Sequence, residues 1–286
     1  MAGRTVVAAS DVGLDAPKKI TMDDLVTKGS GLPSRFCFYG PEGSGKTSIA
    51  AHFPKPVFLQ VSGETGLDTL INTHQLPETP RFQNIDTYDD YKGGIDAIRH
   101  GDHDFKTLVI DTFNGVEILV AEWVLQTLYG GVETGNKGFN SYNSGNKSTA
   151  VQFRHVINEL ERIREERKMT IVCLAHTKVG KAKNTDDADH PQNCPDMSTE
   201  VWSLCGKWFD AILFLKPETV VVTDKDSGKV TSSFTGTRNL HTSYNSTYIA
   251  KNRHGLPEEI DMGSSGKEAY ANLKAAVTAG RNITTK

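Results

Sequence analysis

The sequence predicts an α/β fold in which a mainly parallel sheet is flanked by helices and extended by antiparallel strands near the C-terminus. Over the first two-thirds of the 286 residues, short apolar runs alternate with amphipathic segments. This alternation indicates parallel strands joined by crossover helices. The last third differs, because two strand-like runs, 219–223 and 229–235, surround the turn sequence Asp226-Ser227-Gly228.

Run length and periodicity define the individual elements. Continuous apolar runs such as 107–111 and 169–175 are typical of strands buried on both faces. Segment 149–168 has Phe153, Val156 and Leu160 on one helical face and charged residues on the opposite face. We therefore expect strands at 36–39, 56–61, 82–85, 107–111, 169–175, 208–215 and 247–250, and helices at 47–53, at 88–100, directly after Asp111, at 149–168 and at 267–278.

Two polar stretches interrupt this pattern, 130–148 and 177–200. Loops of that length in a compact domain are either functional or disordered. The whole chain is expected to divide into a flexible N-terminal segment (1–32), a core domain (33–262) and a C-terminal helix with a tail (263–286).

Composition limits the kind of partner. The net charge is −3 and 37% of the residues are hydrophobic, so any nucleic-acid binding requires a local basic patch or an assembled surface. No run approaches the roughly 18 apolar residues of a membrane span, and no convincing signal peptide is visible. We expect a protein without a membrane partner, located in the cytoplasm, or in the host cytoplasm if it is phage-encoded.

Residues 40–47 form a complete phosphate-binding loop, GxxxxGK[ST], between a strand-like run and a helix. Such a loop points backbone N–H groups at a polyphosphate, and the helix N-terminus adds positive potential. Lys46 is expected to reach the β- and γ-phosphates, and the Thr47 hydroxyl to hold Mg²⁺. The sequence therefore predicts ATP and Mg²⁺ as ligands, with Gly40, Pro41, Glu42, Gly43, Ser44, Gly45, Lys46, Thr47 and Ser48 around the nucleotide.

Asp111 ends an apolar strand that we expect beside the P-loop strand, so its carboxylate would serve as the second metal ligand with Thr47. Capping of the following helix is its alternative role. Thr112 follows where many ring-shaped AAA+ machines have a glutamate.

The residue that activates water must then come from another loop. Glu64, just past the second strand, is the expected base, the alternative being an ordinary exposed glutamate. Its position would be close to the P-loop if the second strand neighbours the P-loop strand. His176 ends the strand 169–175 and is expected to sense the γ-phosphate, the alternative being a buried histidine satisfied by its neighbours.

These features together resemble the RecA-type recombinase core, most closely the short, phage-encoded Sak-type single-strand annealing ATPases. The resemblance spans residues 33–262 and rests on the order and spacing of five motifs. These are Gly-Pro-Glu-Gly-Ser-Gly-Lys-Thr at 40–47, Glu64-Thr65-Gly66-Leu67, Val109-Ile110-Asp111-Thr112, Ala175-His176 and Lys251-Asn252-Arg253-His254-Gly255.

The resemblance implies a homo-oligomer, either a ring or a filament, that assembles on single-stranded DNA with ATP at subunit interfaces. Lys251 and Arg253 match the basic pair that reaches a neighbour's ATP, as an arginine finger does. The two polar stretches would line the DNA, with lysines for phosphates and aromatic rings for bases; disordered surface loops are the alternative. The DNA-binding candidates are Lys137, Phe139, Tyr142, Lys147, Lys178, Lys181 and Lys183.

We therefore expect a Mg²⁺-dependent ATPase that acts on single-stranded DNA in recombination or strand annealing, with a single-strand-binding protein among its partners. Its catalytic residues would be Lys46, Glu64, His176, Lys251 and Arg253. The alternatives are a small-molecule phosphotransferase, a helicase loader or remodeller, and a nucleotide-gated protein-interaction module without DNA binding. Both polar stretches lack arginine, which counts against the phosphotransferase.

Overall fold

The computed structural model describes residues 20–182, 189–223 and 230–283, and it places their side chains except at 219–236 and 281–283. A mixed sheet organises residues 32–286. Residues 1–31 form a separate unit, whose described part contains a single 3-10 turn, η2 (Met22–Asp24), with a capping box between Thr21 and Asp24. Among the described residues, no helix combines the length and the apolar character needed to cross a membrane.

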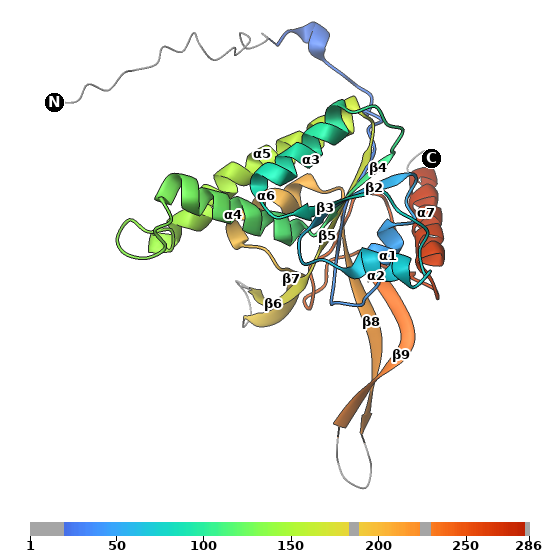
Figure 1. The fold of residues 1–286 in the computed structure, drawn as a ribbon. Coiled ribbons are helices and arrows are strands. Elements are labelled where there is room, and N and C mark those ends of the chain that lie inside the picture. The colour runs from blue at the N-terminus through green and yellow to red at the C-terminus, as the bar shows by residue number, and fades with distance from the viewer. Residues whose placement is uncertain (1–19, 183–188, 224–229, 284–286) are drawn as a thin grey trace, which may run out of the picture. The chain divides into compact units, whose positions relative to one another are not determined.

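The described strands form a nine-stranded sheet in the order β11-β9-β8-β1-β5-β4-β2-β3, with β10 paired to β8 (Figure 1). The pairs from β8 across to β3 are parallel, whereas β9, β10 and β11 are added antiparallel. This confirms the expected α/β fold with antiparallel strands toward the C-terminus. The strands are β1 (Arg35–Tyr39), β2 (Pro56–Val61), β3 (Arg81–Ile85), β4 (Thr107–Asp111), β5 (Thr170–Ala175), β8 (Ala211–Thr223), β9 (Val230–His241), β10 (Lys251–Asn252) and β11 (Glu259–Asp261).

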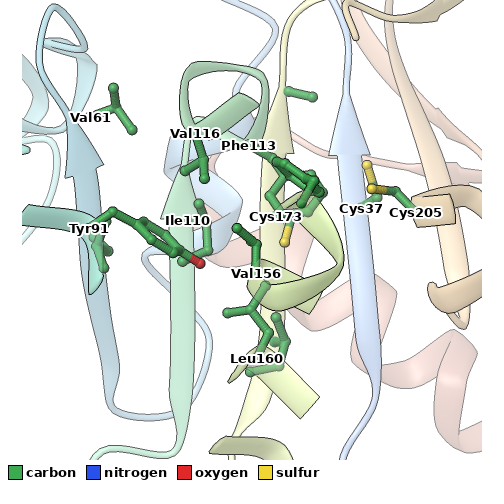
Figure 2. Packing of buried hydrophobic residues seen from close by; sticks show 14 of the residues in the cluster. Cys37, Val61, Tyr91, Ile110, Phe113, Val116, Val156, Leu160, Cys173 and Cys205 are labelled. Atoms are coloured by element: carbon green, nitrogen blue, oxygen red, sulfur yellow. The ribbon is translucent and has the colours of Figure 1, made fainter. Parts of the chain in front are cut away.

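Helices cover both faces of the sheet, and each face has its own hydrophobic layer (Figures 1 and 2). Successive residues of β1 alternate between the layers as a strand period of two requires, with Cys37 and Tyr39 on one side and Phe36 and Phe38 on the other. The first layer includes α3 (Tyr88–His100), α4 (Phe113–Tyr129), α5 (Ser144–Glu166) and α6 (Thr199–Trp208); the second includes α1 (Lys46–Ala50), α2 (Gly66–Asn72) and α7 (Gly266–Ile283).

The C-terminal helix belongs to the same unit as the sheet. Ala269 and Leu273 of α7 are buried in the second layer with Ile49 of α1. This compact unit accordingly runs from Leu32 to Lys286.

The strand order differs from the expected one in a way that concerns the site. β5 lies between β1 and β4, so the strand of Asp111 is not the neighbour of the P-loop strand. β2, which leads to Glu64, pairs with β4 and not with β1. The expected adjacency of the Asp111 strand and the P-loop strand was wrong, because β5, which comes later in the chain, is inserted between them. The condition stated for Glu64 is not met either, since β5 and β4 both lie between β1 and β2.

Both polar stretches contain more regular structure than expected. In 130–148 a 3-10 turn, η3 (Ser141–Asn143), runs directly into α5, which begins at Ser144. Residues 177–195 form an antiparallel hairpin of β6 (Thr177–Ala182) and β7 (His190–Pro195). The turn of this hairpin, 183–188, lies outside the described residues.

Helix α6 was also not expected. Its N-terminus is capped by Ser198, whose side chain accepts a hydrogen bond from Val201 N, while the buried Glu117 carboxylate accepts from Ser198 N at 3.0 Å. These two bonds satisfy donors that a helix start leaves open. α6 therefore occupies the start of the expected strand 208–215, and β8 begins only at Ala211.

The last part of the core departs from expectation by a few residues. The strand expected at 247–250 is instead β10, at Lys251–Asn252, and the short β11 was missed. The hairpin β8–β9 is present, with its turn at 224–229 outside the described residues.

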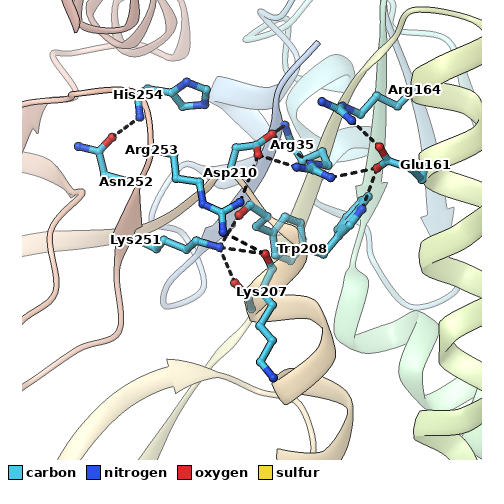
Figure 3. A network of polar contacts seen from close by, with 12 residues as sticks. Arg35, Glu161, Arg164, Lys207, Trp208, Asp210, Lys251, Asn252, Arg253 and His254 are labelled. Carbon is cyan, nitrogen blue, oxygen red and sulfur yellow. Dashed lines mark hydrogen bonds and ion pairs between the residues drawn. The ribbon is translucent and has the colours of Figure 1, made fainter. Parts of the chain in front are cut away.

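An ion-pair network ties the start of β1 to α5 and to the start of β8 (Figure 3). Arg35 donates to Asp210 from Nε at 3.1 Å and from Nη2 at 2.6 Å, and to Glu161 from Nη1 at 3.1 Å. Glu161 also pairs with Arg164 and accepts from Trp208 Nε1 at 2.9 Å. Burial raises the pKa of Asp210, but the hydrogen bonds and charge of Arg35 outweigh it, so that pKa lies below its usual value.

We expect Asp210→Asn to lower the free energy of unfolding by about 2 kcal/mol at pH 7, because it removes a charge-assisted bidentate pair. A lowered folded-state pKa stabilises the protein above the unfolded pKa of about 4, and this contribution is lost as pH falls through the folded value. The variant should therefore lose less stability than wild type on acidification. Urea unfolding at pH 7 and at about pH 2, below the unfolded pKa, measures both effects. Asp104→Asn, in an exposed pair with Lys55, is the control. Equal acid sensitivity of wild type and Asp210→Asn would contradict the assignment.

Candidate functional site

The site lies where the parallel strands end. Tyr39 is opposite Ala175, Leu174 is opposite Asp111, and Asp111 is opposite Gln60, so the carboxyl ends of β1, β5, β4 and β2 meet at one edge. A cavity of about 610 Å³ opens there. It is lined by residues 42–48, 63–66, 69–70 and 75, together with Asp111, Thr112, His176 and Arg238.

The phosphate-binding loop depends on its glycines. Gly43 and Gly45 have φ values of +70° and +99°, the left-handed region that side chains disfavour. Gly40 has a different constraint, because a Cβ there would lie 2.4 Å from the carbonyl oxygen of Leu215 in β8. The Gly45 carbonyl accepts the hydrogen bond from Ile49 N that starts α1, so the helix begins directly at the end of the loop that lines the cavity.

Lys46 is 7% exposed, and its ammonium lies inside the loop that it serves. Nζ donates to the carbonyl oxygens of Gly40 and Pro41, each at 2.8 Å. Burial lowers the pKa of Lys46, and the charges of Asp111 and Glu64 act in the opposite direction. The lysine is thus a buried cation at the place where the motif requires one.

Thr47, in the first turn of α1, and Asp111, at the end of β4, are brought together although β1, which leads into the P-loop, and β4 are not neighbours. Thr47 Oγ1 donates to Asp111 Oδ2 at 3.3 Å, and Asp111 is 3% exposed. Burial, followed by the negative charge of Glu64, raises the pKa of Asp111 to about 7. Helix α4 is capped by Thr112, whose Oγ1 accepts from Gly115 N, so Asp111 is free of that role. A hydroxyl and a carboxylate beside a phosphate-binding loop are the hard oxygen donors that Mg²⁺ prefers.

Glu64 and His176 form a hydrogen-bonded pair in the same cavity. Glu64 Oε1 lies 3.0 Å from His176 Nε2 and accepts from Thr112 Oγ1 at 3.0 Å. The bond to His176 is the main cause that lowers the pKa of Glu64, and the same bond raises the pKa of His176. The geometry therefore favours a carboxylate paired with a protonated imidazole.

Two neighbouring polar residues, which sequence reasoning missed, position this pair. Gln60, at the end of β2 and 3% exposed, donates from Nε2 to the Glu64 carbonyl at 2.8 Å. Asn114 Oδ1 accepts from the backbone N–H of His176 at 3.0 Å. A polar side chain at the end of an otherwise apolar strand is the signal that could have drawn attention to Gln60.

Arg238 was also missed, and it comes from the antiparallel part of the sheet. It lies on β9 opposite Pro217 of β8, and its side chain reaches the P-loop. A Cβ on Gly45 would be 2.9 Å from Arg238 Nη1. Nothing in the sequence spacing connects residue 238 with residues 40–47, because the contact depends on how the hairpin packs.

Comparison with known proteins assigns the family. The profile of the AAA domain family AAA_24 matches residues 32–254. The chain belongs to the AAA_24 family. The crystal structure of the RadB recombinase is similar at a TM-score of 0.45 and 13% identity, covering 82% of this chain and 90% of that one. No curated protein matches. Family membership and the complete phosphate-binding loop identify the chain as a nucleotide-binding P-loop ATPase.

In this AAA_24 protein, Lys251 and Arg253 lie far from the cavity. Lys251 is opposite Ile212 at the amino end of β8, whereas the P-loop follows the carboxyl end of the adjacent β1. Lys251 Nζ donates to three carbonyl oxygens at the C-terminus of α6, and Arg253 Nη1 lies 3.8 Å from Asp210 Oδ1 (Figure 3). Neither residue therefore reaches the nucleotide site of its own chain. The acceptors of Lys251 are the carbonyl oxygens of Gly206, Lys207 and Phe209 at 2.8, 3.2 and 2.6 Å.

The DNA-binding candidates of the first polar stretch fall into two groups. Lys137, Lys147 and Tyr142 are exposed, with Tyr142 at 90%. Phe139 is half-buried, and its ring packs edge-on against Tyr129 with centroids 5.5 Å apart. Phe139 thus anchors the segment to the core and offers less of its face for stacking.

The lysines of the second stretch lie on the β6–β7 hairpin. Lys178 Nζ donates to the Met197 carbonyl at 2.7 Å and lies 3.4 Å from Asp196, while Lys181 pairs with Asp189 at 3.0 Å. Lys183 lies outside the described residues. The two described lysines are therefore partly neutralised by carboxylates of the same hairpin.

We expect Gly40→Ala to lower the free energy of unfolding by about 1 to 3 kcal/mol and to weaken nucleotide binding, because the added methyl would push the P-loop away from β8. Gly93→Ala is the matched control: it lies in α3 with nothing within 4 Å of an added Cβ, and should stabilise by about 0.5 to 1 kcal/mol. Urea unfolding and nucleotide titration measure both. A neutral Gly40→Ala would show that the contact with Leu215 relaxes freely.

Lys251 caps the carbonyl end of α6, so Lys251→Met should lower the free energy of unfolding by about 1 to 2 kcal/mol even without nucleotide. Lys274→Met, at an exposed position in α7, removes the same charge and should leave stability unchanged. Thermal and urea unfolding of the nucleotide-free variants test this. If Lys251→Met is as stable as wild type, Lys251 does not stabilise the C-terminus of α6, and a function between subunits is the role that remains for it.

Proposed function

We propose that this protein is a Mg²⁺-dependent ATPase that acts on single-stranded DNA in recombination or strand annealing, and that it is phage-encoded. The observation that carries the proposal is the convergence of Lys46, Thr47, Asp111 and the Glu64–His176 pair on one cavity. These groups supply a phosphate-binding cation, oxygen ligands and a carboxylate base, which is the set required for phosphoryl transfer to water.

Binding of the substrate is assigned to the P-loop. Lys46 exchanges its bonds to the loop carbonyls for the β- and γ-phosphates of ATP. Thr47 and Asp111 would hold Mg²⁺, which would supply positive charge beside the phosphate oxygens. Because Lys46 and Asp111 are buried, their charges act in a medium that screens them weakly.

Hydrolysis is assigned to Glu64. Its carboxylate takes a proton from a water molecule as the water oxygen bonds to the γ-phosphorus, and the bond from that phosphorus to the bridging oxygen breaks, releasing ADP and phosphate. Glu64 Oε1 accepts from Thr112 and pairs with His176, and the bond to His176 lowers the pKa of the carboxyl, which makes the carboxylate a weaker base. The sensor role is assigned to His176: when its imidazole turns to the γ-phosphate, this bond is lost and Glu64 becomes a stronger base.

The DNA role is assigned to the surface around η3 and to the β6–β7 hairpin. Lys137, Lys147 and the exposed Tyr142 combine cationic charge with a ring for base stacking, which suits single strands. Lys178 and Lys181 add cationic charge on the hairpin, and Lys183, outside the described residues, is the remaining candidate. The hairpin begins directly after His176, which links nucleotide state to DNA contact.

Assembly is assigned to a ring or filament in which Lys251 and Arg253 of one subunit meet the ATP of the next. Their distance from the nucleotide site of their own chain supports a role between subunits. A single-strand-binding protein is proposed as a further partner.

One observation favours a second function, that of a nucleotide-gated protein-interaction module. Lys178 and Lys181 are paired with Asp196 and Asp189, so the hairpin presents balanced charge and not a basic surface. A hairpin of this kind suits a protein partner that reads the state of His176.

Steady-state ATP hydrolysis tests the proposal. Single-stranded DNA should raise the rate at least about tenfold over protein alone, and duplex DNA should not; Lys46→Ala serves as the blank. Glu64→Gln should lower kcat about 100-fold or more while nucleotide still binds, because general-base catalysis contributes that much. Hydrolysis indifferent to DNA would overturn the DNA role, and unchanged turnover in Glu64→Gln would favour the interaction module.

A further inference from the structure

The structure holds a cation at the nucleotide site that the P-loop motif does not include. Arg238 lines the cavity formed by Lys46, Thr47 and Asp111, although it belongs to β9 and follows the P-loop by almost 200 positions. Its backbone is fixed on both sides: it pairs with Pro217 of β8, and its carbonyl accepts from Met262 N at 3.0 Å. The position of its Cα is therefore set by the sheet.

The guanidinium has no protein partner among the residues that the structure describes. Other arginines of the core, such as Arg35 and Arg99, form ion pairs with carboxylates at 2.6 Å. The carboxylates nearest to Arg238 along the adjacent strands are used by its neighbours. Glu218 accepts from Asn239 Nδ2 at 2.6 Å, and Glu259 accepts from Asn239 and pairs with His241.

The place of Arg238 along the P-loop indicates which phosphates it would meet. A second, smaller cavity between the P-loop and α7 is also lined by Arg238, together with Ser44, Gly45 and Ser48, and contains neither Glu64 nor His176. Arg238 thus lies on the flank where the loop backbone cradles the α- and β-phosphates, away from the groups that face the γ-phosphate. The buried Ser44 Oγ lies on the same flank and has no hydrogen-bond partner within the described part of the chain.

We propose that Arg238 binds the α- and β-phosphates of the nucleotide within its own subunit, as a second cationic ligand beside Lys46. The proposal rests on nucleotide binding by the P-loop, the first step of the proposed function. A planar guanidinium suits phosphate oxygens because it donates two parallel hydrogen bonds. Since both ADP and ATP carry these phosphates, Arg238 contributes to binding before and after hydrolysis, and it couples nucleotide occupancy to the hairpin β8–β9.

The test is equilibrium binding of Mg·ADP and of a non-hydrolysable ATP analogue to the full-length protein by calorimetry. Arg238→Gln should weaken both nucleotides by about tenfold, the effect of losing one charge-assisted hydrogen bond. Arg238→Lys should recover part of the loss. Arg154→Gln, which removes an exposed arginine on α5, is the control and should bind like wild type.

Each outcome decides the proposal. Equal affinity of wild type and Arg238→Gln for ADP overturns it, and so does a loss confined to the ATP analogue, which would place the guanidinium at the γ-phosphate. Thermal unfolding without nucleotide should be the same in all variants, and a large drop for Arg238→Gln would assign the arginine a structural role instead. If single-stranded DNA does not stimulate hydrolysis but ADP binds normally, the DNA function is contradicted and the proposal for Arg238 is unaffected. If the wild-type protein binds no nucleotide, both proposals lose their basis.

Discussion

Four parallel strands that end at one edge of the sheet impose the arrangement on which the rest of the structure depends. Main-chain pairing holds β1, β5, β4 and β2 in register, with neighbouring strands about 4.8 Å apart. Lys46, Asp111 and His176 are thereby delivered to one cavity from separate parts of the chain. The same geometry buries Lys46 and Asp111 away from water, which disfavours the charged form of each group. An opposite charge nearby is therefore needed to stabilise that charged form. In the proposed function, a phosphate and a divalent cation supply these opposite charges.

Local sequence patterns were sufficient for the fold class and for most elements. Runs such as 107–111 are read from a few adjacent residues, and the ends of parallel strands meet by rule, so the approach of Asp111 to Thr47 could be anticipated. The order of strands could not, because the insertion of β5 between β1 and β4 is decided by packing between segments far apart in the chain. Helix α6 was missed for a related reason: Glu117, a distant residue, supplies part of its capping.

The parts of the site that escaped prediction share one property. Arg238 and Gln60 act through positions fixed by β9 and β2, and their sequence surroundings resemble those of ordinary strand residues. Lys251 illustrates the converse, since a motif that suggests a contact between subunits also provides the cap of α6 within the chain. A motif can suggest one contact for a side chain while the folded chain uses that side chain for another.

The link between His176 and the β6–β7 hairpin has a mechanical consequence. β6 starts at the very next residue, and the carbonyl of His176 accepts from Asp196 N at 2.9 Å, so the histidine backbone closes the base of the hairpin. The strand β7 is also held to the segment that follows β9, because Asn193 N donates to the Thr247 carbonyl at 2.8 Å and Ile249 N donates to the Asn193 carbonyl at 3.0 Å. The N–H of His176 is fixed as well, since it donates to Asn114 Oδ1 at 3.0 Å. With both sides of its backbone bonded in this way, the histidine can answer a change in the cavity by turning its imidazole about the side-chain bonds while its peptide stays in place.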